Sequence, residues 1–204
     1  MKQQVPSLVQ NWLEKEYPKI REEARRARAQ IYFGDESGNR SDYHAGTSWA
    51  PKGQTPRVKS TGRRFSLNMI SALSPQEHLR FLVVDGRVGA AKFCEFLQRL
   101  VKGVRKKVFL ILGNHPVHRS KKVKNLLEQL DGKLKIFFLP PYSPELNPDE
   151  LVWGHVKSKV ARATVGSQSE MSSKIIGSLR SLQKKPGIVK AFFKHVDCCY
   201  AAAL

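Results

Sequence analysis

The sequence has few cysteines and no long apolar run. Its three cysteines, Cys94, Cys198 and Cys199, follow no metal-ligand spacing, and an odd number with one adjacent pair argues against a disulfide framework. No apolar run approaches the ~18 residues that cross a bilayer. The amino-terminal stretch is amphipathic with mixed charge and lacks the apolar core of a secretory signal. These absences argue against a secreted disulfide-rich protein and a membrane protein, and they favour a reducing cytoplasm.

Acidic residues are scarce as well. The chain has 36 Lys and Arg against 17 Asp and Glu, a formal net charge of +19. Such an excess favours a polyanionic partner such as nucleic acid, because neutralising phosphates releases condensed counterions. A ribosome-associated or merely soluble basic protein has the same composition, so charge alone indicates no reaction. The 204 residues and 41% hydrophobic content suffice for one domain with a real core.

The apolar spacing predicts an alternating arrangement of helices and strands. Helical spacing occurs in residues 5–28, 88–101 and 119–130 and in a long segment capped by Asn147, and Pro18 should kink or split the first helix. Short apolar runs typical of strands cover residues 30–38, 64–74, 79–85, 108–112 and 135–139. Three consecutive strands with short turns should be antiparallel, whereas two later strands reached through helices should run parallel to a neighbour. We therefore expect an α/β fold with a mixed five-stranded sheet and helices on both faces.

Polar groups follow strands or begin a helix at three places: Asp35-Glu36, Gly113-Asn114-His115 and Asp149-Glu150. If the first and fourth strands are neighbours, the first two places lie together at the strand ends where open α/β sheets bind ligands. The proline-rich loop before Asp149 should carry the third place over the same edge. Clustered carboxylates repel one another unless cations bridge them, and hard oxygen ligands suit Mg²⁺ or Mn²⁺. Two such ions about 3.5–4 Å apart serve phosphodiester transfer.

Three strings in this order, GDESG, LILGNHPVH and LPPYSPELNPDELVW, resemble the catalytic domain of DDE transposases of the mariner-like superfamily, in particular their bacterial insertion-sequence branch. The resemblance runs from about Gln30 to Lys159 and includes WAPKGQTP and DGRVGAAKF. PPYSPELNP is a highly specific string. The resemblance implies an RNase H-like fold and a DDE superfamily endonuclease that cleaves and transfers DNA strands at transposon ends with two Mg²⁺ or Mn²⁺ ions.

The resemblance also assigns site residues. Asp35 matches the first metal-binding Asp and Glu150 matches the last acid, with Asp149 as the second choice. The second Asp of the family falls at Gly113, which offers no side-chain ligand, and Asn114 would be a neutral, weaker one. We therefore expect a weakened metal site, negligible strand transfer, and recovery in a Gly113→Asp variant.

The same resemblance suggests how the chain is divided. We expect an N-terminal helix and linker in residues 1–29, an RNase H-like DDE catalytic domain in 30–165 and a C-terminal helical extension in 166–204. Intact enzymes of the family carry helix-turn-helix domains ahead of the catalytic part, and only one helical segment precedes Gln30. The chain thus resembles the downstream half of a split or truncated transposase, placed in the bacterial cytoplasm and associated with the nucleoid.

The expected partners are transposon ends and target DNA, with a second copy of the chain or a full-length transposase as a possible protein partner and no membrane. Two other functions remain open: a non-catalytic DNA-binding fragment that acts as a binding or regulatory protein, and a structure-selective nuclease on the same fold. Four basic runs suggest a track for DNA phosphates. The candidate contacts are Lys52, Arg57, Arg63, Arg64, His118, Arg119, Lys121, Lys122 and Lys157.

Structural alternatives apply to several of these residues. Glu150 could bond back to the start of its helix in a capping box instead of binding metal. We expect His115 and His118 to contact phosphate or shape their loop rather than bind metal. Trp153 should be a core residue rather than a platform for a base.

Overall fold

The computed structural model describes residues 4–41, 51–54, 64–161 and 165–202. Its five-stranded sheet has the order β3-β2-β1-β4-β5. The strands are β1 (Gln30–Arg40), β2 (Ser66–Leu73), β3 (Leu79–Val84), β4 (Val108–Leu112) and β5 (Leu134–Phe138). β1, β2 and β3 are antiparallel, whereas β4 runs parallel to both β1 and β5. The predicted mixed sheet, with the first and fourth strands as neighbours, is confirmed.

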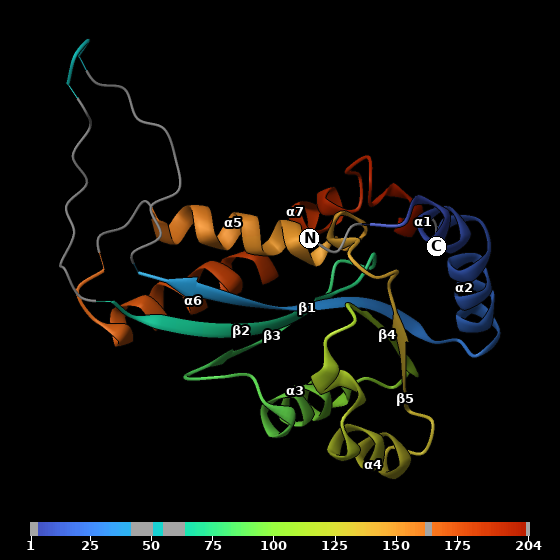
Figure 1. The fold of residues 1–204 in the computed structure, drawn as a ribbon. Coiled ribbons are helices and arrows are strands. Elements are labelled where there is room, and N and C mark those ends of the chain that lie inside the picture. The colour runs from blue at the N-terminus through green and yellow to red at the C-terminus, as the bar shows by residue number, and fades with distance from the viewer. Residues whose placement is uncertain (1–3, 42–50, 55–63, 162–164, 203–204) are drawn as a thin grey trace.

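Helices cover both faces of this sheet, as Figure 1 shows, with α3 and α4 on one side and α5 and α6 on the other. The helices are α1 (Pro6–Asn11), α2 (Tyr17–Arg26), α3 (Ala90–Val101), α4 (Lys121–Gln129), α5 (Asp149–Ala161), α6 (Gln168–Gln183) and α7 (Pro186–Phe192). Short 3₁₀ turns occupy Pro116–Arg119, Pro144–Leu146 and Cys199–Ala201. Among the described helices, none has the length and apolar character needed to cross a bilayer.

The expected disturbance near Pro18 takes the form of a π-helical turn. Residues Trp12–Glu16 are π-helical and join α1 to α2, and the Tyr17 N–H bonds to the Trp12 carbonyl five residues back. Pro18 then lies in the first turn of α2, where its missing N–H leaves no helical bond unmade. The wide turn therefore lets the helical path continue through the proline.

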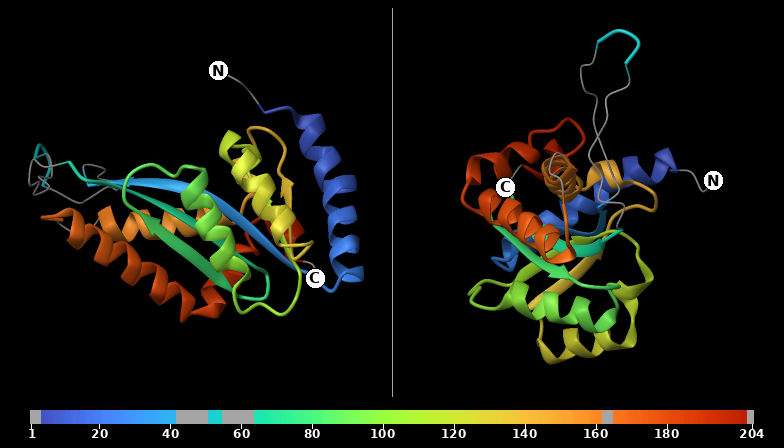
Figure 2. Two further views of the ribbon diagram at one scale, coloured as in Figure 1. Left: turned by 90° about the horizontal axis from the view of Figure 1, so that it is seen from below. Right: turned by 90° about the vertical axis from the view of Figure 1, so that its left-hand side faces the viewer.

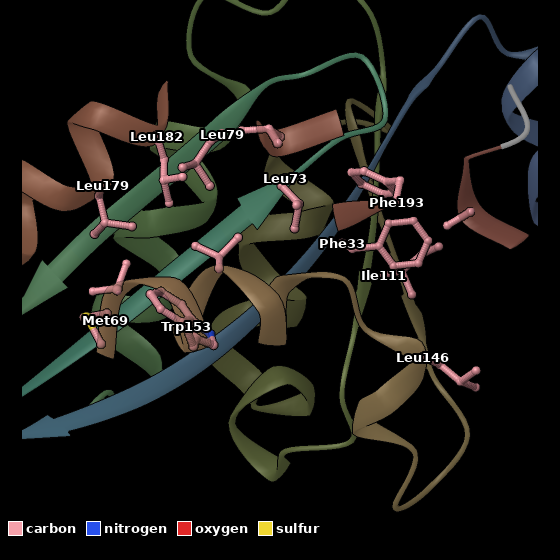
Figure 3. Packing of buried hydrophobic residues seen from close by; sticks show 14 of the residues in the cluster. Phe33, Met69, Leu73, Leu79, Ile111, Leu146, Trp153, Leu179, Leu182 and Phe193 are labelled. Carbon is pink, nitrogen blue, oxygen red and sulfur yellow. The ribbon is translucent and has the colours of Figure 1, made fainter. Parts of the chain in front are cut away.

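The core lies on both faces of the sheet because neighbouring side chains of each strand point to opposite sides. On the face covered by α5 and α6, Phe33, Met69 and Ile111 pack with Trp153, and Figure 3 shows this packing. On the other face, Tyr32 packs with residues of α3 and α4. Trp153 is fully buried, as a core residue should be.

The two ends of the chain contribute to the first of these faces. Figure 2 shows the N-terminal helices and the C-terminal segment at the same end of the molecule. Tyr17 and Tyr200 meet there edge to face, with ring centroids 4.8 Å apart, and both pack on the cluster that contains Phe33. The division of the chain at residues 29 and 165 stays a prediction. The described segments before residue 30 and after residue 165 pack into the same core as the strands.

Candidate active site

The end of the β1–β4 pairing brings Asp35 and Gly113 to one edge of the sheet. Parallel pairing of the two strands ends at Gly34 and Leu112, so each candidate position follows directly. Gly34 has to be a glycine, because a Cβ there would lie 2.8 Å from the Ser71 carbonyl oxygen and 3.2 Å from two leucine side chains. The close approach of β1 and β2 at Gly34 sets Asp35 opposite Ser71.

Asn147 ties the start of α5 to this edge. Its Nδ2 donates to the Gly34 carbonyl oxygen at 3.1 Å, and its Oδ1 accepts from the Asp149 N–H at 3.1 Å. The prediction that Asn147 caps the helix is therefore confirmed. The Asn147 N–H itself donates to the Pro144 carbonyl at 2.8 Å. That bond takes the donor that a capping box would offer to Glu150, so the Glu150 side chain is left to the site.

The side chains of Asp35 and Glu150 come together and are hydrogen-bonded to each other. Burial, followed by the charge of Glu150, raises the pKa of Asp35 to about 8. A hydrogen bond between two carboxyl groups requires one of them to hold a proton. A cation bound at this point would replace that proton and relieve the repulsion between the two groups. The convergence of segments more than 100 residues apart, expected from the sequence, is present.

Asp149 occupies the interior of the same cluster. It is 0% exposed, and the Ser71 hydroxyl lies 2.7 Å from both of its carboxyl oxygens. The backbone N–H of Asp35 also bonds to it. Burial raises the pKa of Asp149 well above its usual range. Asp149 is thus engaged in internal hydrogen bonds and joins β1, β2 and α5, whereas Glu150 is exposed at the cluster's edge.

Gly113 lies beside the Asp35–Glu150 pair and leaves open space. A cavity of about 170 Å³ is lined by Asp35, Gly113 and Glu150, together with Asn114 and Tyr142. A Cβ built at Gly113 meets no heavy atom within 4 Å, and its backbone is outside the left-handed region. An aspartate side chain therefore fits at this position without displacing a neighbour.

The Asn114 side chain is engaged at both ends of its amide. Its Nδ2 donates to the Leu139 carbonyl at 2.7 Å, and its Oδ1 accepts from Arg119 Nη2 at 2.6 Å. The Arg119 guanidinium lies 4.1 Å above the centre of the Phe138 ring. Both ends of the Asn114 amide hold the loop after β4 against the chain after β5.

Of the two expected roles of His118, its contacts fit shaping the loop rather than binding a DNA phosphate at the surface. His118 is 3% exposed, with its ring centroid 4.6 Å from that of Phe93. Its Nδ1 donates to the Gly113 carbonyl oxygen at 2.9 Å, and its Nε2 lies 2.7 Å from Glu36 Oε1. A phosphate cannot reach this imidazole, because both ring nitrogens are occupied inside the protein. His118 instead fixes the peptide of Gly113 relative to β1.

The other basic candidates fall into three groups. Arg57 and Arg63 lie outside the described residues. Lys52, Lys121 and Lys122 are exposed, and Lys157 is partly buried. Arg64 and Arg119 have partners within the chain. Lys121 and Lys122 begin α4, one turn beyond the loop that carries Gly113.

Asp35 also lines a second cavity, in addition to the one beside Gly113. This second cavity measures about 460 Å³ and is lined by Asp35, Glu36, Asn68, Arg87 and His115, among others. The sequence did not single out Arg87 or Asn68 as site residues: Arg87 lies in the turn after β3, and Asn68 lies within β2. The Asn68 amide donates to the Gly86 carbonyl at 2.6 Å and so shapes the turn that carries Arg87.

The donor set fits a divalent cation only in part. Within residues 4–41, 51–54, 64–161 and 165–202, no three His, Cys, Asp or Glu side chains form a group ready to hold a metal ion. Asp149 is close to the pair, but its oxygens are bound to Ser71 and to the Asp35 backbone. Asp35 and Glu150 remain as two hard oxygen ligands facing the cavity beside Gly113.

Comparison with known proteins places these features in a family. The model of the DDE superfamily endonuclease family matches residues 30–172. A curated relative, the insertion element IS630 uncharacterized 39 kDa protein of Shigella sonnei, is 25% identical over 134 residues, which are 65% of this chain and 39% of that protein. The chain thus spans well under half of this relative.

Solved structures agree on the fold. The crystal structure of the mariner Mos1 paired end complex with Mg superposes with a TM-score of 0.64 at 15% identity, over 98% of this chain and 64% of that one. The catalytic domain of Mos1 mariner transposase superposes with a TM-score of 0.55 at 13% identity, over 94% and 95% of the two chains. These likenesses confirm the RNase H-like fold.

The family match covers most of the chain and contains Asp35, Gly113 and Glu150. The expected resemblance to mariner-like and insertion-sequence transposases is confirmed by the relatives found. This chain belongs to the DDE superfamily endonucleases.

Proposed function

We propose that this chain is the catalytic domain of a transposase that cleaves and transfers DNA strands at transposon ends, and that its activity is impaired by Gly113. The observation that carries this proposal is the hydrogen-bonded pair of Asp35 and Glu150, which lines one small cavity together with Gly113. The two acids that the resemblance assigns to the metal thus lie together at the edge of the sheet. Gly113, which the resemblance assigns to the other acid position, lies beside them and has no side chain.

Asp35 and Glu150 would hold Mg²⁺ or Mn²⁺, in keeping with the similar Mos1 complex that contains Mg. A bound divalent cation would stabilise the negative charge that develops on the oxygens of the reacting phosphodiester. The protein's own part is to hold the two carboxyl groups together, through Ser71 and Asn147, against their mutual repulsion. The exposed cations beyond Gly113 would hold the DNA backbone.

The impairment follows from ligand number rather than from distortion. Glycine removes one carboxylate from the cation, and the amide of Asn114 is committed to Leu139 and Arg119. The surrounding backbone is otherwise intact, since His118 still holds the Gly113 carbonyl. Restoring the side chain should therefore restore metal affinity without any further change.

Calorimetric titration with Mn²⁺ and nicking of supercoiled plasmid test this proposal together. The Gly113→Asp variant should bind Mn²⁺ at least tenfold more tightly, since a direct charged ligand contributes about 1.5–3 kcal/mol. It should also nick plasmid in the presence of Mn²⁺, whereas the parent chain should show negligible nicking. Gly187→Asp is the matched control, because Gly187 also has no heavy atom within 4 Å of a built Cβ and lies in α7.

Two results would contradict the proposal. Robust nicking by the parent chain would show that the missing acid is dispensable. Equal Mn²⁺ affinity in Gly113→Asp and Gly187→Asp would show that Gly113 is not a ligand position.

A second candidate function is a non-catalytic DNA-binding fragment that acts through a second copy or a full-length transposase. The two-ligand site and the net charge of +19 favour it. It predicts salt-sensitive binding of DNA without turnover, even after Gly113→Asp and with Mn²⁺ present. Plasmid nicking and a binding titration on the same preparation separate the two functions.

A further inference from the structure

A cavity at the opposite end of β4 has the character of an anion site. It measures about 390 Å³ and lies where β1, β3 and β4 begin, with Tyr32, Arg80, Arg105 and Lys106 in its lining. This volume is within the ~300–1,000 Å³ typical of small-molecule pockets. Its position separates it from Asp35 and Gly113, which follow the far end of the β1–β4 pairing.

The charges around this cavity are of one sign. Among the described residues that line it, three are permanent cations and none is Asp or Glu. Glu77 is close in sequence, but its carboxylate lies 3.5 Å from Lys190 Nζ. Like charges gathered around one space repel one another, and an anion bound between them removes that cost.

Tyr32 brings a hydroxyl group to the lining of this cavity. Its side chain is 1% exposed. The Arg80 guanidinium lies near the Tyr32 hydroxyl, and an arginine can donate a hydrogen bond to it but cannot accept one. The hydroxyl proton of Tyr32 is therefore free to point to an acceptor that enters the cavity.

The walls of the cavity are anchored, so the site exists before a ligand binds. Lys133 Nζ donates to the Arg105 carbonyl at 2.8 Å, which fixes the loop before β4. The Gln30 N–H donates to the Lys107 carbonyl at 2.7 Å, and Gln30 Nε2 lies 2.7 Å from His78 Nδ1. These bonds join the starts of β1 and β4 to the turn before β3.

We propose that this cavity binds a phosphate group between Arg80, Arg105 and Lys106, with the Tyr32 hydroxyl donating to one phosphate oxygen. Guanidinium groups match the geometry of phosphate oxygens, and charge-assisted hydrogen bonds are the strong ones. The phosphate belongs either to the DNA backbone or to a free phosphate compound. The inference does not depend on the proposed catalytic function, since none of its residues belongs to the Asp35 cluster.

Pyrophosphate titrated calorimetrically into the whole chain, without divalent cations, tests the site. Tyr32→Phe keeps every charge and should weaken binding about threefold, the effect of one net hydrogen bond. Arg80→Gln, Arg105→Gln and Lys106→Gln combined should weaken it by more than about tenfold. The matched control combines Lys15→Gln, Lys19→Gln and Lys194→Gln, three exposed lysines outside the cavity, which remove the same charge elsewhere and should leave affinity within about twofold.

A 20-base-pair duplex provides the second arm and identifies the source of the phosphate. If DNA is the ligand, Tyr32→Phe and the triple variant weaken duplex binding, and pyrophosphate competes with the duplex. If a free phosphate compound is the ligand, pyrophosphate binding falls in these variants while duplex binding matches that of the control. The proposal is overturned if pyrophosphate shows no saturable binding, if Tyr32→Phe binds it as the parent does, or if both triple variants lose affinity equally.

Discussion

The two sides of the candidate active site differ in completeness. On the α5 side, Asp149 is buried against Ser71 and the Asp35 backbone, and Asn147 joins the helix to Gly34. On the β4 side, the supporting bonds of Asn114 and His118 are present, but Gly113 has no acid to support. The comparison teaches that the hydrogen bonds of the loop after β4 form without an acidic side chain at position 113. Under the proposed function, a ligand side chain and the bonds that would position it are therefore separable.

The independence of these hydrogen bonds from an acid at position 113 has a physical basis. The bonds of Asn114 and His118 stabilise the loop after β4 against β5 and β1, whether or not a metal binds. An aspartate at Gly113 would stand close to Asp35 and Glu150 and would add repulsion in the absence of a cation. A glycine at this position therefore costs the fold little, whereas loss of a buried group such as Asp149 would cost much more.

The largest effect on stability should come from the α5 side. Asp149→Ala leaves the Ser71 hydroxyl unpaired and opens a small void, at a cost of about 3 kcal/mol. Asp149→Asn keeps an acceptor for Ser71 and removes an acid whose buried charge is unfavourable, so its effect should stay within about 1 kcal/mol. Urea unfolding at neutral pH measures both. Equal losses in the two variants would mean that the carboxylate charge itself supports the fold.

Asp35 should produce the next largest effect, through pH. Its folded-state pKa of about 8 lies above its ordinary value of 3.8, so the folded protein keeps a proton that the unfolded chain has released. The stability contributed by this proton is complete below the ordinary pKa and is lost as pH rises to about 8. The loss should be on the order of 2 kcal/mol, because Asp35 is partly exposed and solvent screening reduces the effect of the full shift.

The difference in unfolding free energy between the parent and Asp35→Asn, followed across this pH range, isolates the effect. Glu128→Gln is the control, since Glu128 is exposed on α4. Mn²⁺ should reduce the pH dependence by taking the place of the proton. A parent and an Asp35→Asn variant with parallel pH profiles would show that Asp35 titrates normally.

The sequence predicted the parts of this site that follow from chain topology. A strand reached through a helix runs parallel to its neighbour, so Asp35 and Gly113 were expected at adjacent strand ends if the first and fourth strands paired, as they do. The proline loop and the cap at Asn147 predicted where α5 begins, and the string PPYSPELNP indicated the family. These features are local or follow from general rules of connection, which is why they can be read without coordinates.

The features of the site that the sequence did not predict depend on where side chains point and on how deeply they are buried. Asp149 and Glu150 are consecutive in a helix, where neighbours point about 100° apart, so one is buried and the other exposed. His118 lies in a basic, polar loop whose composition predicts a surface, yet its ring packs on Phe93. Ser71 carries no motif and acquires its role only because β2 pairs with β1 at Asp35.

A smaller effect is expected on the β4 side from Asn114→Ala. This change frees the Leu139 carbonyl and one hydrogen bond of Arg119, and it should cost about 1–2 kcal/mol in urea unfolding. Asn125→Ala on the exposed side of α4 serves as the control. In the Gly113→Asp background, the same change should also weaken Mn²⁺ binding, because the loop no longer holds the new carboxylate in place. Unchanged Mn²⁺ affinity would mean that Asn114 supports the fold alone.

The smallest effect should come from the exposed cations next to this side. Lys121 and Lys122 begin α4, while Arg119 is held over Phe138 and bonded to Asn114. If both lysines contact phosphates, Lys121→Gln with Lys122→Gln should reduce the slope of log affinity against log salt by about 1.8 for duplex DNA. Lys15→Gln with Lys19→Gln on the N-terminal helices removes the same charge. An equal change in slope for both pairs would show that DNA senses only the net charge and that the β4 side carries no phosphate track.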